Sequence, residues 1–314
     1  MSPGRRRTPF GTRLETAMDV HGPLCVGIDP HPGLLAAWGL PDDAAGLGEF
    51  VARVMDAVGG HVAAVKGQSA LFERHGSAGI AVLERLIVLG REAGTLVIVD
   101  AKRGDIGSTM VAYADAYLRD GSPLAGDALT VSPFLGFGSL TPAIEAARAT
   151  GRGVFVLALT SNPEGATIQE ATPSPPTSAP GGHRPPTAPG DGGPRSVPRR
   201  SVAGEIAAAA GVMNAAELAV SGARLGSVGL VVGATVGAAV ARLGIDLAAV
   251  RGPLLAPGVG AQGAGAAELA AVFGSARRAV LASSSRAILA AGPDVAALRD
   301  AARRSAADAA LALR

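Results

Sequence analysis

The sequence predicts a (β/α)8 barrel, and two observations point to it. Eight short apolar runs alternate along the 314-residue chain with segments of helical periodicity, which is typical of a parallel α/β fold. Polar or charged side chains also follow most of the apolar runs. In a barrel the carboxyl ends of the strands meet at one mouth, whereas a doubly wound sheet, the alternative, spreads them along an edge. The polar residues therefore favour the barrel.

The predicted strands are short and apolar, and most end at a charged residue, Ser, Pro or Gly. The first ends at Asp29, because Pro30 and Pro32 interrupt regular structure. The second ends at Lys66, and the third leads into Asp100. In chain order the predicted strands are 23–28, 61–65, 95–99, 127–131, 154–159, 228–232, 253–256 and 279–282.

The predicted helices fill the intervals between strands. The segment at 44–58 places Leu47, Phe50, Val51, Val54 and Val58 on one stripe, as a helix packed on a sheet requires. In chain order the predicted helices are 9–21, 44–58, 77–93, 108–118, 139–149 and 201–224. With eight strands, these segments match the size of a single barrel domain.

One stretch departs from the barrel pattern. Residues 171–198 hold nine of the 22 prolines, with Gly, Ser and Thr and almost no large apolar residue. Such a composition forms no core, so we expect a disordered insertion over 166–200, in the loop after the fifth strand. A Pro-rich ligand segment is the alternative. We expect one barrel domain over 9–314, with a flexible basic tail at 1–8 around Arg5-Arg6-Arg7.

Composition argues against several classes of protein. The net charge is +2 and aromatic residues make up 3%, so neither charge nor base stacking indicates nucleic-acid binding. The single cysteine, Cys25, excludes an intrachain disulfide and lies in an apolar run, where we expect a buried, inert thiol. Without a long apolar stretch or a secretory signal, we expect a cytoplasmic protein with no membrane contact.

The charged residues around the third strand are the strongest candidates for chemistry. Asp100 and Lys102 are two positions apart and should point the same way from a strand. With Lys66 and Asp105 they could form an alternating network of two cations and two anions. A lysine between carboxylates stays protonated, which makes Lys102 a candidate general acid. A purely structural salt-bridge network is the alternative.

Other predicted site residues lie at the ends of other strands. Asp29 has no obvious cation beside it and suits a ligand hydroxyl; a turn or helix-cap role is the alternative. The glycine-rich segment 257–263 includes Gln262, and Arg286 follows the last strand near the expected start of a helix. Because loops after the seventh and eighth strands of barrels often bind phosphate, we expect a phosphate site here. Glycine turns with a surface-paired Arg286 are the alternative.

The five histidines form no recognisable metal pattern, and we expect no metal site. His31 follows the first strand and is a candidate for lining the mouth. The segment 257–263 lacks the third glycine of a dinucleotide-binding fingerprint.

Residues 100–109, Asp100-Ala-Lys102-Arg-Gly-Asp105-Ile-Gly-Ser-Thr109, closely resemble the signature of the orotidine 5′-phosphate decarboxylase family. The longer bacterial members are the most similar, and the resemblance covers about 10–165 and 201–300. Further segments agree with the family in the same order: Val26-Gly-Ile-Asp29-Pro30, Val65-Lys66, Thr160-Ser161-Asn162-Pro163 and Pro257-Gly-Val-Gly-Ala-Gln262-Gly263.

The resemblance implies a (β/α)8 homodimer that converts orotidine 5′-monophosphate to UMP and CO2 without metal or organic cofactor. It implies that Lys102 protonates C6 and that Asp100 lies near the departing carboxylate. Asp105 and Thr109 would reach the partner's site. The implied substrate contacts are Asp29 and Lys66 to the ribose, Ser161 to the pyrimidine, and Gln262 and Arg286 to the phosphate.

Two other functions remain open at this point. A metal-dependent sugar-phosphate lyase of the same barrel superfamily shares an Asp-x-Lys-x-x-Asp core, although the context of Arg103, Gly104, Ile106 and Thr109 argues against it. A non-catalytic nucleotide-binding protein is the second alternative. Because the charged residues at 66, 100, 102 and 105 are all present, the decarboxylase is the preferred reading.

Overall fold

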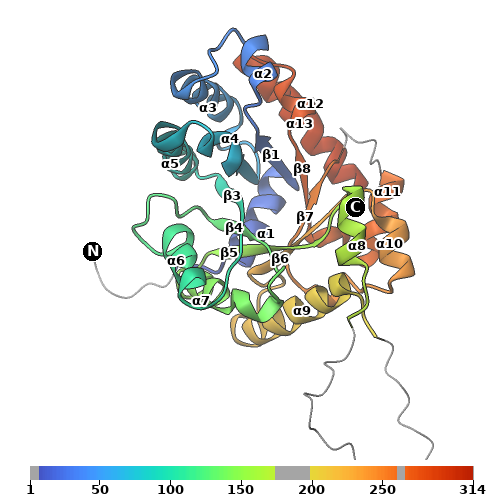
Figure 1. Cartoon of the computed structure of the whole chain (residues 1–314). Helices are drawn as coiled ribbons and strands as arrows, with labels where there is room; N and C mark the ends of the chain where they lie inside the picture. The colour runs from blue at the N-terminus through green and yellow to red at the C-terminus, as the bar shows by residue number, and fades with distance from the viewer. Residues whose placement is uncertain (1–6, 174–198, 260–265, 314) are drawn as a thin grey trace, which may run out of the picture.

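The computed structural model describes residues 7–173, 199–259 and 266–313 and confirms the predicted barrel. Eight parallel strands pair in sequence order, and β8 closes the sheet on β1 (Figure 1). The strands are β1 (Leu24–Ile28), β2 (Ala64–Gln68), β3 (Leu96–Arg103), β4 (Ala128–Val131), β5 (Gly153–Leu159), β6 (Val228–Val232), β7 (Leu254–Pro257) and β8 (Val280–Ser284).

Helices surround the closed sheet (Figure 1). The six predicted helices correspond to α1 (Phe10–His21), α3 (Ala44–Val58), α5 (Gly76–Ala93), α6 (Gly107–Leu118), α7 (Thr141–Ala149) and α9 (Val202–Ser221). The helix expected near Arg286 is α12 (Arg286–Leu289). The prediction missed α2 (Pro32–Ala37), α4 (Ser69–Glu73), α8 (Ala166–Gln169), α10 (Gly237–Arg242), α11 (Ala266–Phe273) and α13 (Val295–Ala312). Pro32 is the first residue of α2, a position where its fixed φ favours a helix.

The predicted second strand is displaced along the chain. We expected it at 61–65, but β2 spans Ala64–Gln68, so Lys66 lies within the strand. The reason is the pairing of Ala64 with Cys25 of β1 and with Leu96 of β3, which sets where the ladder begins. Likewise β3 continues to Arg103 and takes Asp100 and Lys102 into the sheet.

Helix α1 covers the amino-terminal end of the barrel. Its Phe10 and Leu14 belong to the apolar cluster that fills the barrel interior. The Phe10 ring meets Phe155 of β5 edge to face, with ring centroids 5.8 Å apart. Gly153 makes this approach possible, since a Cβ there would lie 2.2 Å from Phe10. Apolar side chains therefore fill the barrel interior at this end.

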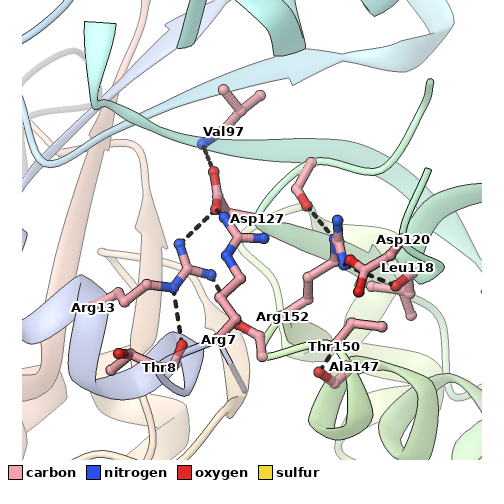
Figure 2. Close-up of polar contacts among 12 residues, drawn as sticks. Arg7, Thr8, Arg13, Val97, Leu118, Asp120, Asp127, Ala147, Thr150 and Arg152 are labelled. Carbon is pink, nitrogen blue, oxygen red and sulfur yellow. Dashed lines mark hydrogen bonds and ion pairs between the residues drawn. The ribbon is translucent and has the colours of Figure 1, made fainter. Parts of the chain in front are cut away.

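The prediction of a flexible tail over residues 1–8 is wrong for its last two residues. Arg7 forms an ion pair with Asp127, and Arg13 of α1 donates to the same carboxylate oxygen over 2.6 Å (Figure 2). Arg13 also donates to the Thr8 carbonyl oxygen over 3.1 Å. The other Asp127 oxygen accepts from the Val97 N–H, which ties this cluster to β3. Residues 1–6 lie outside the described residues.

The expected disordered insertion over 166–200 is wrong at its start. Residues Ala166–Gln169 form helix α8, and the Gln169 side chain exchanges two hydrogen bonds of 2.8 Å with Thr160. Ala171 and Val202 are joined by a main-chain hydrogen bond of 2.8 Å, so the chain returns close to where it left the barrel. Residues 174–198, which contain most of the expected insertion, lie outside the described residues.

Helix α9 is the one helix in the described part of the chain that is long and apolar enough to span a membrane. It packs on β5 and β6, and 44% of its apolar window is buried. Asn214, fully buried on α9, donates to the Val228 and Val250 carbonyl oxygens and accepts from the Val228 N–H. The two bonds to Val228 tie α9 to β6, as expected for a helix that packs on the barrel.

Candidate active site

A cavity of about 1160 Å³ lies at the carboxyl ends of the strands. His31, a candidate for lining the mouth, contributes to its wall. So do six of the nine predicted site residues: Asp29, Lys66, Asp100, Lys102, Ser161 and Arg286. The alternation of strand side chains explains this convergence, because Leu96 and Ile98 of β3 fill the interior and Asp100 follows on the same face.

Lys66, Asp100 and Lys102 form a continuous chain of charges. Lys66 Nζ lies 2.7 Å from Asp100 Oδ2, and Lys102 Nζ lies 2.6 Å from Asp100 Oδ1. The side chains of Lys66 and Asp100 are each 8% exposed, whereas that of Lys102 is 43% exposed. The Lys66 end of this chain of charges is therefore buried in the barrel, and the Lys102 end presents an ammonium group to the cavity. These are the only two lysines in the 314-residue sequence.

Mutual attraction keeps the two buried members of this chain ionised. Burial alone would raise the pKa of Asp100, but the charges of Lys66 and Lys102 outweigh it and lower that pKa to about 2. Burial alone would lower the pKa of Lys66, but Asp100 and Asp29 outweigh it and raise that pKa above its ordinary value. The carboxylate and both of its partners thus form a fixed electrostatic environment.

The expectation that Asp29 has no cation beside it is wrong. Lys66 Nζ lies 4.0 Å from Asp29 Oδ1, a distance that gives attraction without a hydrogen bond. Asp29 Oδ1 is buried and has no hydrogen-bond partner among the described residues. Buried polar atoms are normally paired, so this oxygen is suited to accept from a bound hydroxyl.

The main chain at Lys102 departs from regular strand geometry. Lys102 has φ +47°, and the β3–β4 register shifts between Val99 and Arg103. The simple alternation we expected for Asp100 and Lys102 therefore does not hold, although their side chains do meet. The Lys102 N–H donates to Thr130 Oγ1 of β4 over 2.9 Å. The register shift between Val99 and Arg103 forms a bulge in β3. The Thr130 side chain of the neighbouring strand therefore supports this bulge at Lys102.

Arg286 and Ser161 lie at two other parts of the cavity wall. Arg286 is exposed at the start of α12, two residues after β8 ends, and Ser161 is exposed two residues after β5. An exposed guanidinium at the cavity can bind an anion with paired hydrogen bonds. Gln262, expected to join Arg286, lies outside the described residues.

Asp105 and Thr109 are not brought to this cavity within the chain. Asp105 Oδ1 accepts from the Ile106 N–H over 2.8 Å, and Thr109 is exposed on α6. In the described residues no hydrogen bond or ion pair joins Asp105 to the other charged members. The expected four-member network is therefore a three-member chain within a single subunit.

Several residues of the cavity were not predicted. Thr130 donates to Asp100 Oδ1 over 2.9 Å, but in the apolar run at 127–131 nothing marked its hydroxyl as part of the site. The other polar lining residues to which no role was assigned from the sequence are Gln68, Thr160, Asn162, Ser283, Ser284 and Ser285. In the described part of the chain, no three His, Cys, Asp or Glu side chains are grouped to hold a metal ion.

Comparison with known proteins supports the resemblance seen in residues 100–109. The model of the "Orotidine 5′-phosphate decarboxylase / HUMPS family" matches residues 22–178. A relative named orotidine 5′-phosphate decarboxylase from Salinispora arenicola is 55% identical over 304 residues, covering 97% of this chain and 98% of the relative. The relative of that name from Streptomyces coelicolor is 52% identical over 304 residues, covering 96% of each chain.

Solved structures agree with these relatives. The crystal structure of a candidate orotidine 5′-phosphate decarboxylase from Streptomyces avermitilis has a TM-score of 0.86 and 51% identity, covering 100% of this chain and 99% of that one. The structure of Leishmania donovani OMP decarboxylase has a TM-score of 0.69 and 28% identity, covering 96% and 97%. With the barrel and the charged residues of its mouth, these matches show that the chain belongs to the orotidine 5′-phosphate decarboxylase family.

Proposed function

We propose that this protein decarboxylates orotidine 5′-monophosphate to UMP and CO2, the last step of de novo pyrimidine biosynthesis. The observation that carries the proposal is the buried Lys66–Asp100–Lys102 chain, whose exposed end is an ammonium group in the cavity. Membership of the family and the names of its relatives give independent support.

Decarboxylation breaks the bond between C6 and the carboxyl carbon and leaves the electron pair on C6. The pyrimidine provides no electron sink for this pair, so a preorganised cation must stabilise the charge as it develops. Lys102 Nζ, held 2.6 Å from Asp100 Oδ1, is the cation we assign to that role. Its ammonium proton forms the new C6–H bond as CO2 leaves, and water then reprotonates the lysine.

The other candidate site residues would orient the substrate. Arg286 would bind the phosphate, with Gln262 as a second donor, and Ser161 would contact the pyrimidine amide. Asp29 and Lys66 would bind the ribose hydroxyls, and the unpartnered Asp29 Oδ1 suits that role. Binding energy from the phosphate, far from C6, can then hold the reacting carbon against Lys102.

A homodimer would complete the site, with Asp105 and Thr109 acting in the partner subunit's cavity. The surface beside them supports this, because Ile106 is 61% and Phe134 is 73% exposed. Val111 and Leu135 are also exposed apolar residues of these segments. Exposed apolar side chains gathered on one region are typical of an interface, and burying them would favour association.

We further propose that the enzyme acts in the cytoplasm without metal or organic cofactor. Both oxygens of Asp100 already accept from lysine ammonium groups, which favours a charge network over a metal ligand at this carboxylate. Absorbance at the pyrimidine band, with and without EDTA, tests the proposal. We expect equal turnover of orotidine 5′-monophosphate in both. Loss of turnover in EDTA and recovery with Mg²⁺ would contradict the metal-free reaction. Binding of the nucleotide without any turnover would favour the non-catalytic nucleotide-binding protein.

A further inference from the structure

We propose that Thr130 is a positioning residue for the decarboxylation, because its hydroxyl fixes both the Asp100 carboxylate and the main chain of Lys102. The inference rests on the proposed function and adds a residue to it. Thr130 lies on β4 and is 1% exposed. Its Oγ1 donates to Asp100 Oδ1 over 2.9 Å and accepts from the Lys102 N–H over 2.9 Å. One hydroxyl proton and one lone pair satisfy both contacts.

These contacts form a closed ring with the candidate acid. Lys102 Nζ donates to Asp100 Oδ1, the oxygen to which Thr130 also donates. The main-chain N–H of Lys102 donates to the Thr130 hydroxyl oxygen and closes the ring. Thr130 therefore holds Lys102 at its main chain directly, and at its ammonium group through Asp100.

The ring matters because Lys102 adopts an unfavourable main-chain conformation. Its φ of +47° lies in the left-handed region that residues with a Cβ avoid, so surrounding contacts must maintain it. The register shift between Val99 and Arg103 takes this part of β3 out of the regular ladder with β4. The Thr130 hydroxyl thus supplies a support for the bulge at the position where the ammonium group must be aimed.

Replacing Thr130 by Val keeps the branched shape and removes the hydroxyl. The Lys102 N–H would then lose its acceptor, and Asp100 Oδ1 would lose one donor. The bulge at Lys102 would lose its support from β4. We expect kcat to fall by about 10- to 100-fold, since displacement of a reacting group by about 1 Å costs about this much. We expect little change in KM, because Thr130 does not act on the phosphate or ribose. Thr130→Ser keeps the hydroxyl and should stay within about threefold of wild type.

Thr95 provides a matched control. It is 3% exposed, immediately precedes β3, and its Oγ1 accepts from the Gly60 N–H over 2.7 Å at the opposite end of the barrel. Thr95→Val therefore also removes a buried hydroxyl that accepts from a main-chain N–H, and it should leave kcat unchanged. Thr130→Ala repeats the test with a smaller side chain if Thr130→Val does not fold.

A measurement without turnover completes the test. Because the sequence has only two lysines, protein labelled with ¹³C at lysine Cε gives one signal for each, assigned with Lys102→Ala. We expect Thr130→Val to shift the Lys102 signal and Thr95→Val to leave it in place. The proposal is overturned if folded Thr130→Val keeps wild-type kcat, if Thr130→Ser is as slow, or if the Lys102 signal does not move. Wild-type turnover in the same assay tests the proposed function separately, and the lysine signals decide the Thr130 contact even if turnover is absent.

Discussion

Lys66 Nζ and Asp100 Oδ2 lie 2.7 Å apart in the barrel mouth, with each side chain only 8% exposed. A buried ion pair of this kind is weak evidence of stabilisation, because desolvation of both charges offsets their attraction. Its stronger consequence is that neither partner can be removed alone without leaving a buried charge. The pair therefore fixes the position and charge of Asp100, which in turn holds Lys102.

The first prediction concerns the removal of one partner of this pair. Asp100→Asn leaves the Lys66 ammonium buried without its nearest carboxylate, and we expect the free energy of unfolding to fall by about 3–5 kcal/mol. Urea denaturation measures this change. Glu92→Gln is the control: Glu92 pairs with Arg85 at 3.6 Å with both side chains more than half exposed, so its loss should cost under about 1 kcal/mol. Equal, small losses in the two variants would contradict the assigned pair.

The second prediction concerns the pH dependence of stability. The pKa of Asp100 is about 2 in the folded protein, below its ordinary value of 3.8. The contribution of this carboxylate to the free energy of unfolding is therefore complete above pH 3.8 and is lost as pH falls through about 2. The pKa of Lys66 is raised above its ordinary value of 10.5, so the pH dependence runs the other way. The contribution of the Lys66 ammonium group to the free energy of unfolding is complete below pH 10.5 and is lost only at more alkaline pH.

The comparison is between wild type and Lys66→Met/Asp100→Asn, which lacks both titrating groups. The difference in unfolding free energy between these proteins should be constant from about pH 5 to pH 9 and change below about pH 4. Urea denaturation at a series of pH values checks this. A difference that already changes between pH 7 and pH 5 would show that Asp100 is not held ionised as described.

The third prediction tests the shared site. Lys102→Ala and Asp105→Ala should each be inactive alone, because every site then lacks one residue. After mixing and subunit exchange, a heterodimer has one site with Lys102 from one subunit and Asp105 from the other. Half of the dimers should be heterodimers with one intact site in two, which restores about a quarter of wild-type activity. If the mixture stays inactive although mass spectrometry shows heterodimers, Asp105 does not act across the interface.

Much of the barrel could be predicted from the sequence, because its strands are short apolar runs, most of which end at a charged residue, Ser, Pro or Gly. β1, β3, β5 and β8 bring Asp29, Asp100, Ser161 and Arg286 to one mouth, and the convergence of strand carboxyl ends in a barrel was enough to expect that. The position of Lys66 inside β2 could not be predicted, since pairing with two neighbouring strands decides where β2 begins.

The geometry around Lys102 was beyond sequence reasoning for a different reason. Its left-handed main chain is stabilised by Thr130, which is 28 residues further along, and no local pattern reports such a contact. Short helices such as α8 were missed because four residues are too few to show periodicity. Arg7 was assigned to a tail because its partner, Asp127, is 120 residues away.

The most direct test of the account is the turnover of orotidine 5′-monophosphate by Lys102→Ala. Lys102 is the exposed end of the charge chain, and Asp100 keeps its bonds to Lys66 and Thr130 without it. We therefore expect the variant to fold and to bind UMP, as shown by circular dichroism and calorimetry. Single-turnover kcat should fall by at least about 10³-fold, because both the proton and the stabilising charge are lost. A folded variant that retains kcat within tenfold of wild type would contradict the assignment of Lys102 as the acid.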